Sequence, residues 1–249
     1  MSSDINPKKY FVIAGCQRCG TTALARLLHM HPEVYMAQPL FPEPKYFLNE
    51  TVSKEIYLNQ YFSNAKQAIA IGEKSTSYIE SSTVPKRIKA IFPEAKVIIL
   101  LRDPVYRALS NYQFTKNNNL EPRTPREVFL EEKPPPAYSK SHISVSPYQY
   151  KARGEYIRYI KPWLNIFQPS NILILFYENL INNCNRSAVE LGDFLGLSQP
   201  IDFSILNAPL ETSIDYKENI IAKLQHHYKP YNHQLAELLN IDLKKIWKY

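Results

Sequence analysis

The segment Gly15–Thr22 reads Gly-Cys-Gln-Arg-Cys-Gly-Thr-Thr, which is the spacing of a phosphate-binding loop. Glycines at this spacing let backbone N–H groups converge on an anion, and a helix that starts after the loop adds partial positive charge. Nucleoside triphosphatases carry a lysine that contacts the phosphates at the position occupied here by Thr21. Arg18 supplies a guanidinium instead, and this group can hold an oxyanion without a metal. The loop therefore predicts phosphate or sulfate binding and argues against a triphosphatase.

A second group of polar residues follows an apolar run that is typical of a central strand. Arg102 comes directly after the run 96–101, and Ser110 follows eight residues later. Ligands of open parallel sheets lie beyond the carboxyl ends of the strands. Because a helix that starts near Pro104 returns Ser110 toward the phosphate loop, the spacing predicts a second anion site with Arg102 and Ser110.

The elements that must position these residues alternate between strand-like and helix-like patterns. Strands are predicted over residues 9–14, 33–37, 68–74, 96–101 and 171–177. Helices are predicted over residues 21–30, 84–92, 105–115, 156–167 and 185–195, and from residue 220 onward. This alternation implies an α/β fold in one domain over residues 1–249, with a central parallel β-sheet flanked by α-helices.

Two stretches depart from this pattern. Residues 1–8 are expected to form a flexible N-terminus. Residues 117–147 are polar and include three consecutive prolines at 134–136. The sequence predicts that this second stretch is a mobile excursion on the substrate side rather than a domain linker.

The composition limits the possible partners. The 249 residues carry a formal net charge of +7, which suits an anionic ligand but also a nucleic-acid or membrane-surface protein. No basic run is longer than Lys244-Lys245, and no nucleic-acid recognition motif is present. No stretch approaches the length of a transmembrane helix. We therefore expect neither nucleic acid nor membrane as a partner.

The cysteines indicate a reducing compartment. Only Cys16, Cys19 and Cys184 are present, and this small odd number argues against a disulfide framework. The first residues show no apolar run typical of a signal peptide, so the expected location is the cytoplasm. Cys16 and Cys19 form a CxxC pair, but no second pair completes a metal site. They are expected to fill the phosphate loop as small residues.

Taken together, these motifs resemble the sulfotransferases that use 3′-phosphoadenosine 5′-phosphosulfate (PAPS). The loop GCQRCGTT resembles the 5′-phosphosulfate loop of that family, and LLRDPVYRALSNY resembles its 3′-phosphate motif. The patterns EPKYF and EKSTSY are similar to the branch that contains the heparan sulfate sulfotransferase domains and many bacterial enzymes. The resemblance runs from about Tyr10 to Gly196 and implies the P-loop-like fold of these enzymes.

The resemblance also implies a role for each matching residue. Those implied to bind the 5′-phosphosulfate are Arg18, Cys19, Gly20, Thr21 and Thr22, and those implied to bind the 3′-phosphate are Arg102 and Ser110. Glu43 matches the catalytic glutamate, which would take the proton of the acceptor, and Lys74 matches a lysine of the reaction centre. Arg18 and Lys74 would neutralise charge during an in-line transfer. PAPS would be the cosubstrate and PAP the product, with no metal required.

Departures from the family pattern leave some roles open. Many members carry lysine where this chain has Arg18, and the histidine base of the cytosolic branch has no counterpart here. The lysine-glycine loop that covers the nucleotide in the heparan sulfate branch is not recognisable past Leu206, so adenine contacts stay unassigned. Candidate contacts on the acceptor side are Lys45, His142, Arg153 and Tyr156.

Other interpretations compete with catalysis. A binding protein could keep the nucleotide loop without turnover, and a small-molecule kinase is disfavoured because the loop lacks its lysine. At the level of single residues, Glu43 could be a solvated carboxylate, Glu73 and Lys74 an exposed ion pair, and the 18 tyrosines a generic surface. We expect a bacterial cytosolic enzyme that acts on a hydroxyl or amine of a small-molecule or glycan acceptor. The sequence assigns neither the acceptor nor the oligomeric state.

Overall fold

The computed structural model describes residues 8–65, 67–138, 145–203 and 218–247. The chain divides into two compact units, Met1–Leu101 with Tyr159–Ala208 and Arg102–Arg158 with Pro209–Tyr249. The prediction for the N-terminus falls, except for Lys8, outside the described residues. The single-domain prediction stays a prediction.

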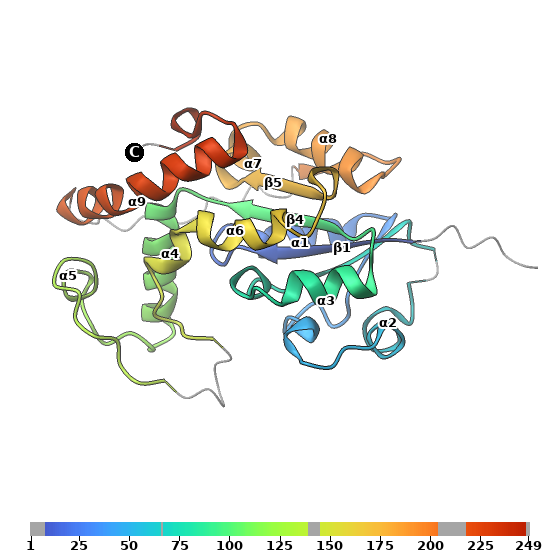
Figure 1. Cartoon of the computed structure of the whole chain (residues 1–249), viewed down its shortest axis with the longest axis horizontal. Coiled ribbons are helices and arrows are strands. Elements are labelled where there is room, and N and C mark those ends of the chain that lie inside the picture. Colours follow the sequence, from blue (N-terminus) through green and yellow to red (C-terminus); the bar gives the residue numbers. More distant parts are fainter. Residues whose placement is uncertain (1–7, 66, 139–144, 204–217, 248–249) are drawn as a thin grey trace, which may run out of the picture. The chain divides into compact units, whose positions relative to one another are not determined.

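The first unit is built on a five-stranded parallel sheet with the order β2-β3-β1-β4-β5. The strands are β1 (Lys9–Gly15), β2 (Val34–Met36), β3 (Ala70–Lys74), β4 (Lys96–Leu101) and β5 (Ile172–Phe176). Figure 1 shows β1, β4 and β5 side by side. Apart from their first residues, β1 and β4 are buried, because central parallel strands are covered on both faces. The parallel sheet predicted from the sequence is confirmed.

The helices of the first unit connect these strands. They are α1 (Thr21–Met30), η1 (Tyr46–Leu48), α2 (Lys54–Phe62), η2 (Tyr78–Glu80), α3 (Val84–Ile91), η4 (Pro169–Asn171), α7 (Tyr177–Asn182) and α8 (Cys184–Leu195), where η marks a 3₁₀ helix. The predicted helix 21–30 is confirmed with both its bounds. The end of α8 at Gly196 is also as predicted, since Gly196 has a φ of 67°. Helix α2 was not predicted, because its only buried residues are Tyr57 and Phe62.

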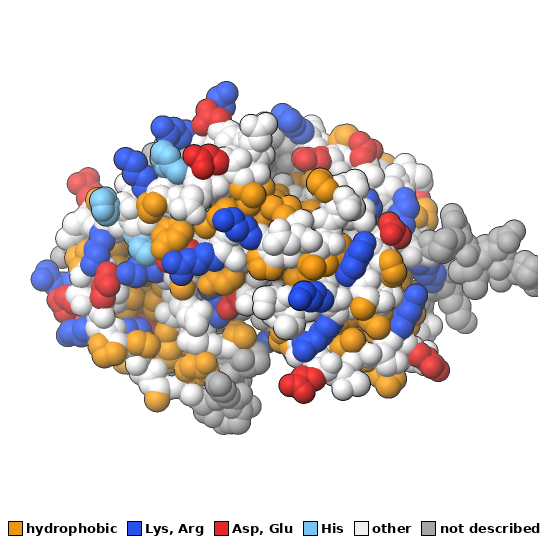
Figure 2. Space-filling model, viewed as in Figure 1, with side chains coloured by type: hydrophobic (Ala, Val, Ile, Leu, Met, Phe, Trp, Pro, Cys, Tyr) orange, Lys and Arg blue, Asp and Glu red, His pale blue; other side chains and the backbone are white. Residues whose placement is uncertain are grey.

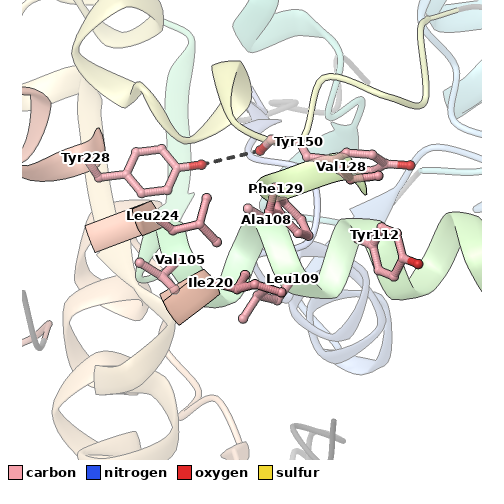
Figure 3. Close-up of a cluster of buried hydrophobic side chains, with 10 residues drawn as sticks. All are labelled: Val105, Ala108, Leu109, Tyr112, Val128, Phe129, Tyr150, Ile220, Leu224 and Tyr228. Carbon is pink, nitrogen blue, oxygen red and sulfur yellow. Dashed lines mark hydrogen bonds between the residues drawn. The ribbon is translucent and has the colours of Figure 1, made fainter. Parts of the chain in front are cut away.

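The second unit is mostly helical. Its elements are α4 (Pro104–Asn117), α5 (Pro125–Phe129), η3 (Ala152–Gly154), α9 (Glu218–Leu239) and η6 (Leu243–Lys245). Side chains of α4, α5 and α9 form a buried apolar cluster, in which the Tyr228 hydroxyl donates to the Tyr150 carbonyl (Figure 3). Helix α6 (Tyr156–Leu164) begins in this unit's part of the chain and contains Pro162. The predicted helices 105–115 and 156–167 are confirmed with shifted bounds.

The stretch 117–147 holds more structure than its composition predicts. A capping box of Thr124 and Glu127 starts α5, and Phe129 at its end is fully buried. No helix is predicted here from the sequence, because the prolines obscure the capping box that starts α5. That the stretch is a mobile excursion stays a prediction. Residues 139–144 lie outside the described part of the chain, and a role on the acceptor side stays a prediction. Among the described residues, no helix has the length and apolarity to cross a membrane.

Candidate functional site

The phosphate-like loop joins β1 to α1, as the sequence predicts. Gly20 caps α1 with a φ of 89°, and a Cβ at this position would lie 2.9 Å from Cδ2 of Tyr177. A Cβ on Gly15 would lie 2.7 Å from Ile79. Arg18, between the two glycines, is exposed and has a φ of 67°. The loop thus has space for glycine only at both positions, because a Cβ at either one would meet Ile79 or Tyr177.

The first turn of α1 presents the helix N-terminus predicted to bind an anion. The first N–H groups of any helix have no partner within the helix, and α1 begins at Thr21, which is 4% exposed, and Thr22, which is exposed. Cys16 and Cys19 are buried, which agrees with the prediction that they fill the loop. The Cys16 N–H donates to the Leu100 carbonyl at 2.8 Å, so the loop starts beside the end of β4.

Glu43, Lys74 and Thr22 meet at this loop. Lys74 Nζ lies 3.0 Å from Glu43 Oε1, with side-chain exposures of 4% and 16%. The same Nζ donates to Thr22 Oγ1 at 3.3 Å. Thr76 donates to the Glu43 carboxylate through its N–H at 3.1 Å and its hydroxyl at 2.9 Å. The Lys74 ammonium group therefore contacts the start of α1 directly, and the Glu43 carboxylate is joined to it through Lys74.

This arrangement corrects the alternative of an exposed Glu73–Lys74 ion pair. Both residues are buried on β3, and the ammonium group of Lys74 pairs with Glu43. Successive side chains of a strand point to opposite faces, so neighbours in the sequence are separated here. The solvated-carboxylate alternative for Glu43 is also wrong, because the side chain is held by Lys74 and Thr76.

The segment that carries Glu43 has two further residues of interest. Lys45 has a φ of 51°, and its N–H donates to Ser75 Oγ at 2.9 Å. Phe41 was not predicted; its side chain is 43% exposed, with Lys74 Nζ 4.8 Å and Arg26 Cζ 5.5 Å from the ring centroid. The signal for Phe41 in the sequence was its place two residues before Glu43.

Under this segment lies a buried polar cluster that sequence reasoning missed. Glu73 Oε1 accepts hydrogen bonds from the hydroxyl groups of Tyr57 at 2.8 Å, Tyr78 at 3.1 Å and Tyr10 at 3.2 Å, and Oε2 accepts one from Ser75 at 2.9 Å. Burial raises the pKa of Glu73 to about 7, and the four hydroxyl donors act against this rise. These three tyrosines are buried, so for them the prediction of a generic surface is wrong.

The remaining predicted residues belong to the second unit. Arg102 and Arg153 are buried and Ser110 is half-buried. Asp103 caps α4 by accepting from the Val105 N–H at 2.9 Å.

Tyr156 is also buried in this unit, and its contacts are those of a packing residue. Its hydroxyl donates to the Arg102 carbonyl at 2.7 Å, and its ring lies against Trp247 with centroids 5.9 Å apart. Its predicted role on the acceptor side stays a prediction, as does that of Arg153. His142 lies outside the described residues. In the described part of the chain, no group of three or more His, Cys, Asp or Glu residues could hold a metal ion.

Comparison with known proteins now identifies the family. The model of the sulfotransferase domain family matches residues 8–227, so this chain belongs to that family. The resemblance seen in the sequence is thereby confirmed, and with it the PAPS-dependent class, which uses PAPS and releases PAP. Family membership does not favour the alternatives of a binding protein or a kinase.

The curated relatives are large enzymes. Bifunctional heparan sulfate N-deacetylase/N-sulfotransferase 4 from Mus musculus is 29% identical over 200 residues, which cover 78% of this chain and 23% of the relative. Bifunctional heparan sulfate N-deacetylase/N-sulfotransferase 1 from Homo sapiens is 29% identical over 199 residues, covering 77% of this chain and 22% of the relative. The chain thus spans less than a quarter of the length of these relatives.

Solved structures confirm the fold. A sulfotransferase from Alicyclobacillus acidocaldarius superposes with a TM-score of 0.78 at 23% identity, covering 96% of this chain and 98% of that one. The sulfotransferase domain from the curacin biosynthetic pathway gives a TM-score of 0.52 at 16% identity over 95% and 98% of the two chains. At these identities the likeness supports the predicted α/β, P-loop-like sulfotransferase fold.

Proposed function

We propose that this chain transfers the sulfuryl group of PAPS to a hydroxyl or amine of a glycan or small-molecule acceptor. The observation that carries the proposal is the contact of Lys74 with both Glu43 and Thr22. This contact joins a candidate base to the helix end that the family uses for the 5′-phosphosulfate. An in-line transfer needs the base and the leaving group to be held close to each other, and the Lys74 contacts place the candidate base beside the helix end proposed to bind the leaving group.

In the proposed reaction, Glu43 acts as the base. The acceptor oxygen or nitrogen attacks the sulfur, its proton moves to a Glu43 carboxylate oxygen, and the bond from sulfur to the phosphate oxygen breaks. The Lys74 ammonium group orients the carboxylate and offsets charge on the transferring group. Arg18 and the N–H groups at the start of α1 neutralise the departing phosphate.

The nucleotide contacts follow from the family motif. The residues proposed for the 5′ side are Arg18, Cys19, Gly20, Thr21 and Thr22, and Arg102 with Ser110 is proposed for the 3′-phosphate. The fit at the 5′ side is supported by the start of α1 directly after this loop, since the first N–H groups of a helix have no partner within the helix.

For the acceptor we propose a chemical class rather than one molecule. The relatives are heparan sulfate N-deacetylase/N-sulfotransferases by name, which favours a glycan amine as the first candidate. Lys45 and the exposed ring of Phe41 flank Glu43 in the sequence and are proposed as acceptor contacts. A cytoplasmic, bacterial setting is proposed from the cysteine usage of the chain, and fractionation of a cell that produces the protein tests the cytoplasmic part.

Binding of PAP tests the donor part of this proposal. At about 100 times its Kd a ligand adds about 2.7 kcal/mol of stability, which raises Tm by about 5–10 °C in a chain of this size. We expect PAP to cause such a shift and Arg102→Ala to remove most of it. Arg126→Ala is the control, since the Arg126 side chain is 73% exposed on α5. Equal stabilisation by ATP with magnesium would contradict the proposal.

Transfer itself is tested with radiolabelled PAPS and a panel of amine-bearing glycans, alcohols and phenols. Label on any acceptor supports the enzyme, and the identity of that acceptor replaces the broad class given above. PAP binding without transfer to any member would favour the binding-protein alternative.

A further inference from the structure

A fully buried carboxylate lies at the end of β3, next in sequence to Lys74. Glu73 is 0% exposed, and its two oxygens accept four hydroxyl hydrogen bonds. Burial of such a group costs free energy even when it is hydrogen-bonded, and replacement by well-packed apolar groups is often neutral or stabilising. A contribution to stability therefore does not explain why the chain buries this carboxylate.

Two of the four hydroxyl groups also bind the backbone of the segment 43–47. The Lys45 N–H donates to Ser75 Oγ at 2.9 Å, and the Phe47 N–H donates to the Tyr78 hydroxyl at 3.0 Å. A hydroxyl group has one proton. Because each proton is directed to the buried carboxylate, the oxygen lone pairs are left to accept the two backbone N–H groups.

The backbone that these bonds hold is strained. Lys45 has a φ of 51°, a conformation that costs on the order of 1–3 kcal/mol outside glycine and persists only where the surroundings fix it. Arg87 adds bonds from its guanidinium to the Phe47 carbonyl at 3.1 Å and the Leu48 carbonyl at 3.2 Å. The carboxylate of Glu43 is held separately by Thr76.

We propose that the hydroxyl groups of Ser75 and Tyr78, oriented by their hydrogen bonds to Glu73, position the segment 43–47 and with it Glu43. The inference rests on the proposed function, since it gives the segment's geometry a catalytic purpose. Tyr10 and Tyr57 complete the set of donors to the carboxylate, but their hydroxyl groups accept no hydrogen bond from the segment's backbone.

The chain offers a matched comparison. Ser75→Ala and Tyr78→Phe each remove one buried hydroxyl that links Glu73 to the segment, whereas Tyr10→Phe removes one that contacts Glu73 and Tyr57 but not the segment's backbone. We expect the first two variants to lower kcat by about 10- to 100-fold, as misplacement of reacting groups does. The KM for PAPS and the thermal shift with PAP should stay within about twofold, and Tyr10→Phe should keep kcat within about twofold.

A second measurement does not depend on activity. Hydrogen exchange of the Lys45 and Phe47 amides should speed up in Ser75→Ala and Tyr78→Phe respectively, and stay slow in Tyr10→Phe. If the wild-type chain transfers no sulfuryl group, the proposed function fails while the exchange result still decides whether the cluster fixes the segment. Unchanged exchange in both linking variants overturns the inference. Equal losses of kcat in all three variants, which a purely structural role predicts, overturn it as well.

Discussion

At the scale of single residues, the Glu43–Lys74 contact decides what the site can do. Lys74 holds one carboxylate oxygen of Glu43, and Thr76 binds both oxygens. A carboxylate held in this way keeps a fixed direction, which a base needs if it is to meet the acceptor proton within hydrogen-bond distance. The proposed catalytic role of Glu43 therefore belongs to a side chain with a fixed position, and the loss of its carboxylate should lower kcat.

We expect Glu43→Gln to lower kcat by about 10²- to 10⁴-fold, the usual contribution of a general base. The amide keeps the shape of the side chain and so should leave the thermal shift with PAP unchanged. Steady-state kinetics with radiolabelled PAPS measure the effect. Glu50→Gln is the control, because Glu50 is an exposed glutamate of the same stretch of chain. Unchanged turnover in Glu43→Gln would place the base at another residue.

At the scale of elements, the junction of β1 and α1 depends on Gly20, because its positive φ and its close neighbours leave no room for a side chain. Gly20→Ala would place a Cβ 2.9 Å from the Tyr177 ring at a φ of 89°. We expect a loss of about 1–3 kcal/mol in the free energy of unfolding and a weaker thermal shift with PAP. Urea denaturation gives the first value.

The matched control for this prediction is Gly192→Ala in α8, where a Cβ meets nothing within 4 Å. Alanine in an open helical position should stabilise the chain by up to about 1 kcal/mol. A loss of stability as large as that of Gly20→Ala would show that the loop geometry is not the cause.

The cluster that joins β1, α2, β3 and η2 makes stability depend on pH. Glu73 has a pKa of about 7 in the folded chain against 4.5 ordinarily, so the folded state holds this proton more tightly than the unfolded state. The contribution of this bound proton to the free energy of unfolding is complete below about pH 4.5. It is lost as the pH rises to about 7, and the free energy of unfolding falls by roughly 3 kcal/mol over this range. Glu73→Gln cannot titrate, so its stability relative to wild type should rise over this range. Urea denaturation between these pH values measures the difference, and parallel curves would contradict the assignment.

At the scale of the whole chain, positive charge favours an anionic donor. The net charge is +7, and Figure 2 shows Lys and Arg side chains spread over the face in view among Asp and Glu. A dispersed field of this kind speeds the encounter with an anion more than it tightens the complex.

We therefore expect the association rate constant of PAP to fall several-fold when salt is raised from about 0.05 M to about 0.5 M, because screening shortens the range of the field. The dissociation rate constant should change much less. Stopped-flow measurement of both gives the comparison, and an association rate independent of salt would exclude steering by the net charge.

Much of this fold could be predicted from the sequence because its signals are local. The buried run of β4, the helix bounds at Thr21 and Met30 and the glycine that ends α8 each follow from residue types within one element. The helices α2 and α5 were missed, since one has a weak apolar pattern and the other depends on a capping box in a proline-rich stretch. Tertiary burial rather than local preference decides α2, whereas the capping box of α5 is a local signal within the sequence.

For the site, the sequence by itself determined the family, the candidate anion-binding loop and the candidates Glu43 and Lys74, because motif spacing is a property of the chain alone. Only the tertiary structure decided that Lys74 pairs with Glu43 rather than lying exposed beside Glu73. It also placed tyrosines from β1, α2 and η2 around one buried carboxylate. These contacts join residues as far as 63 positions apart, and such pairs are fixed by packing, which leaves no periodic trace in the sequence.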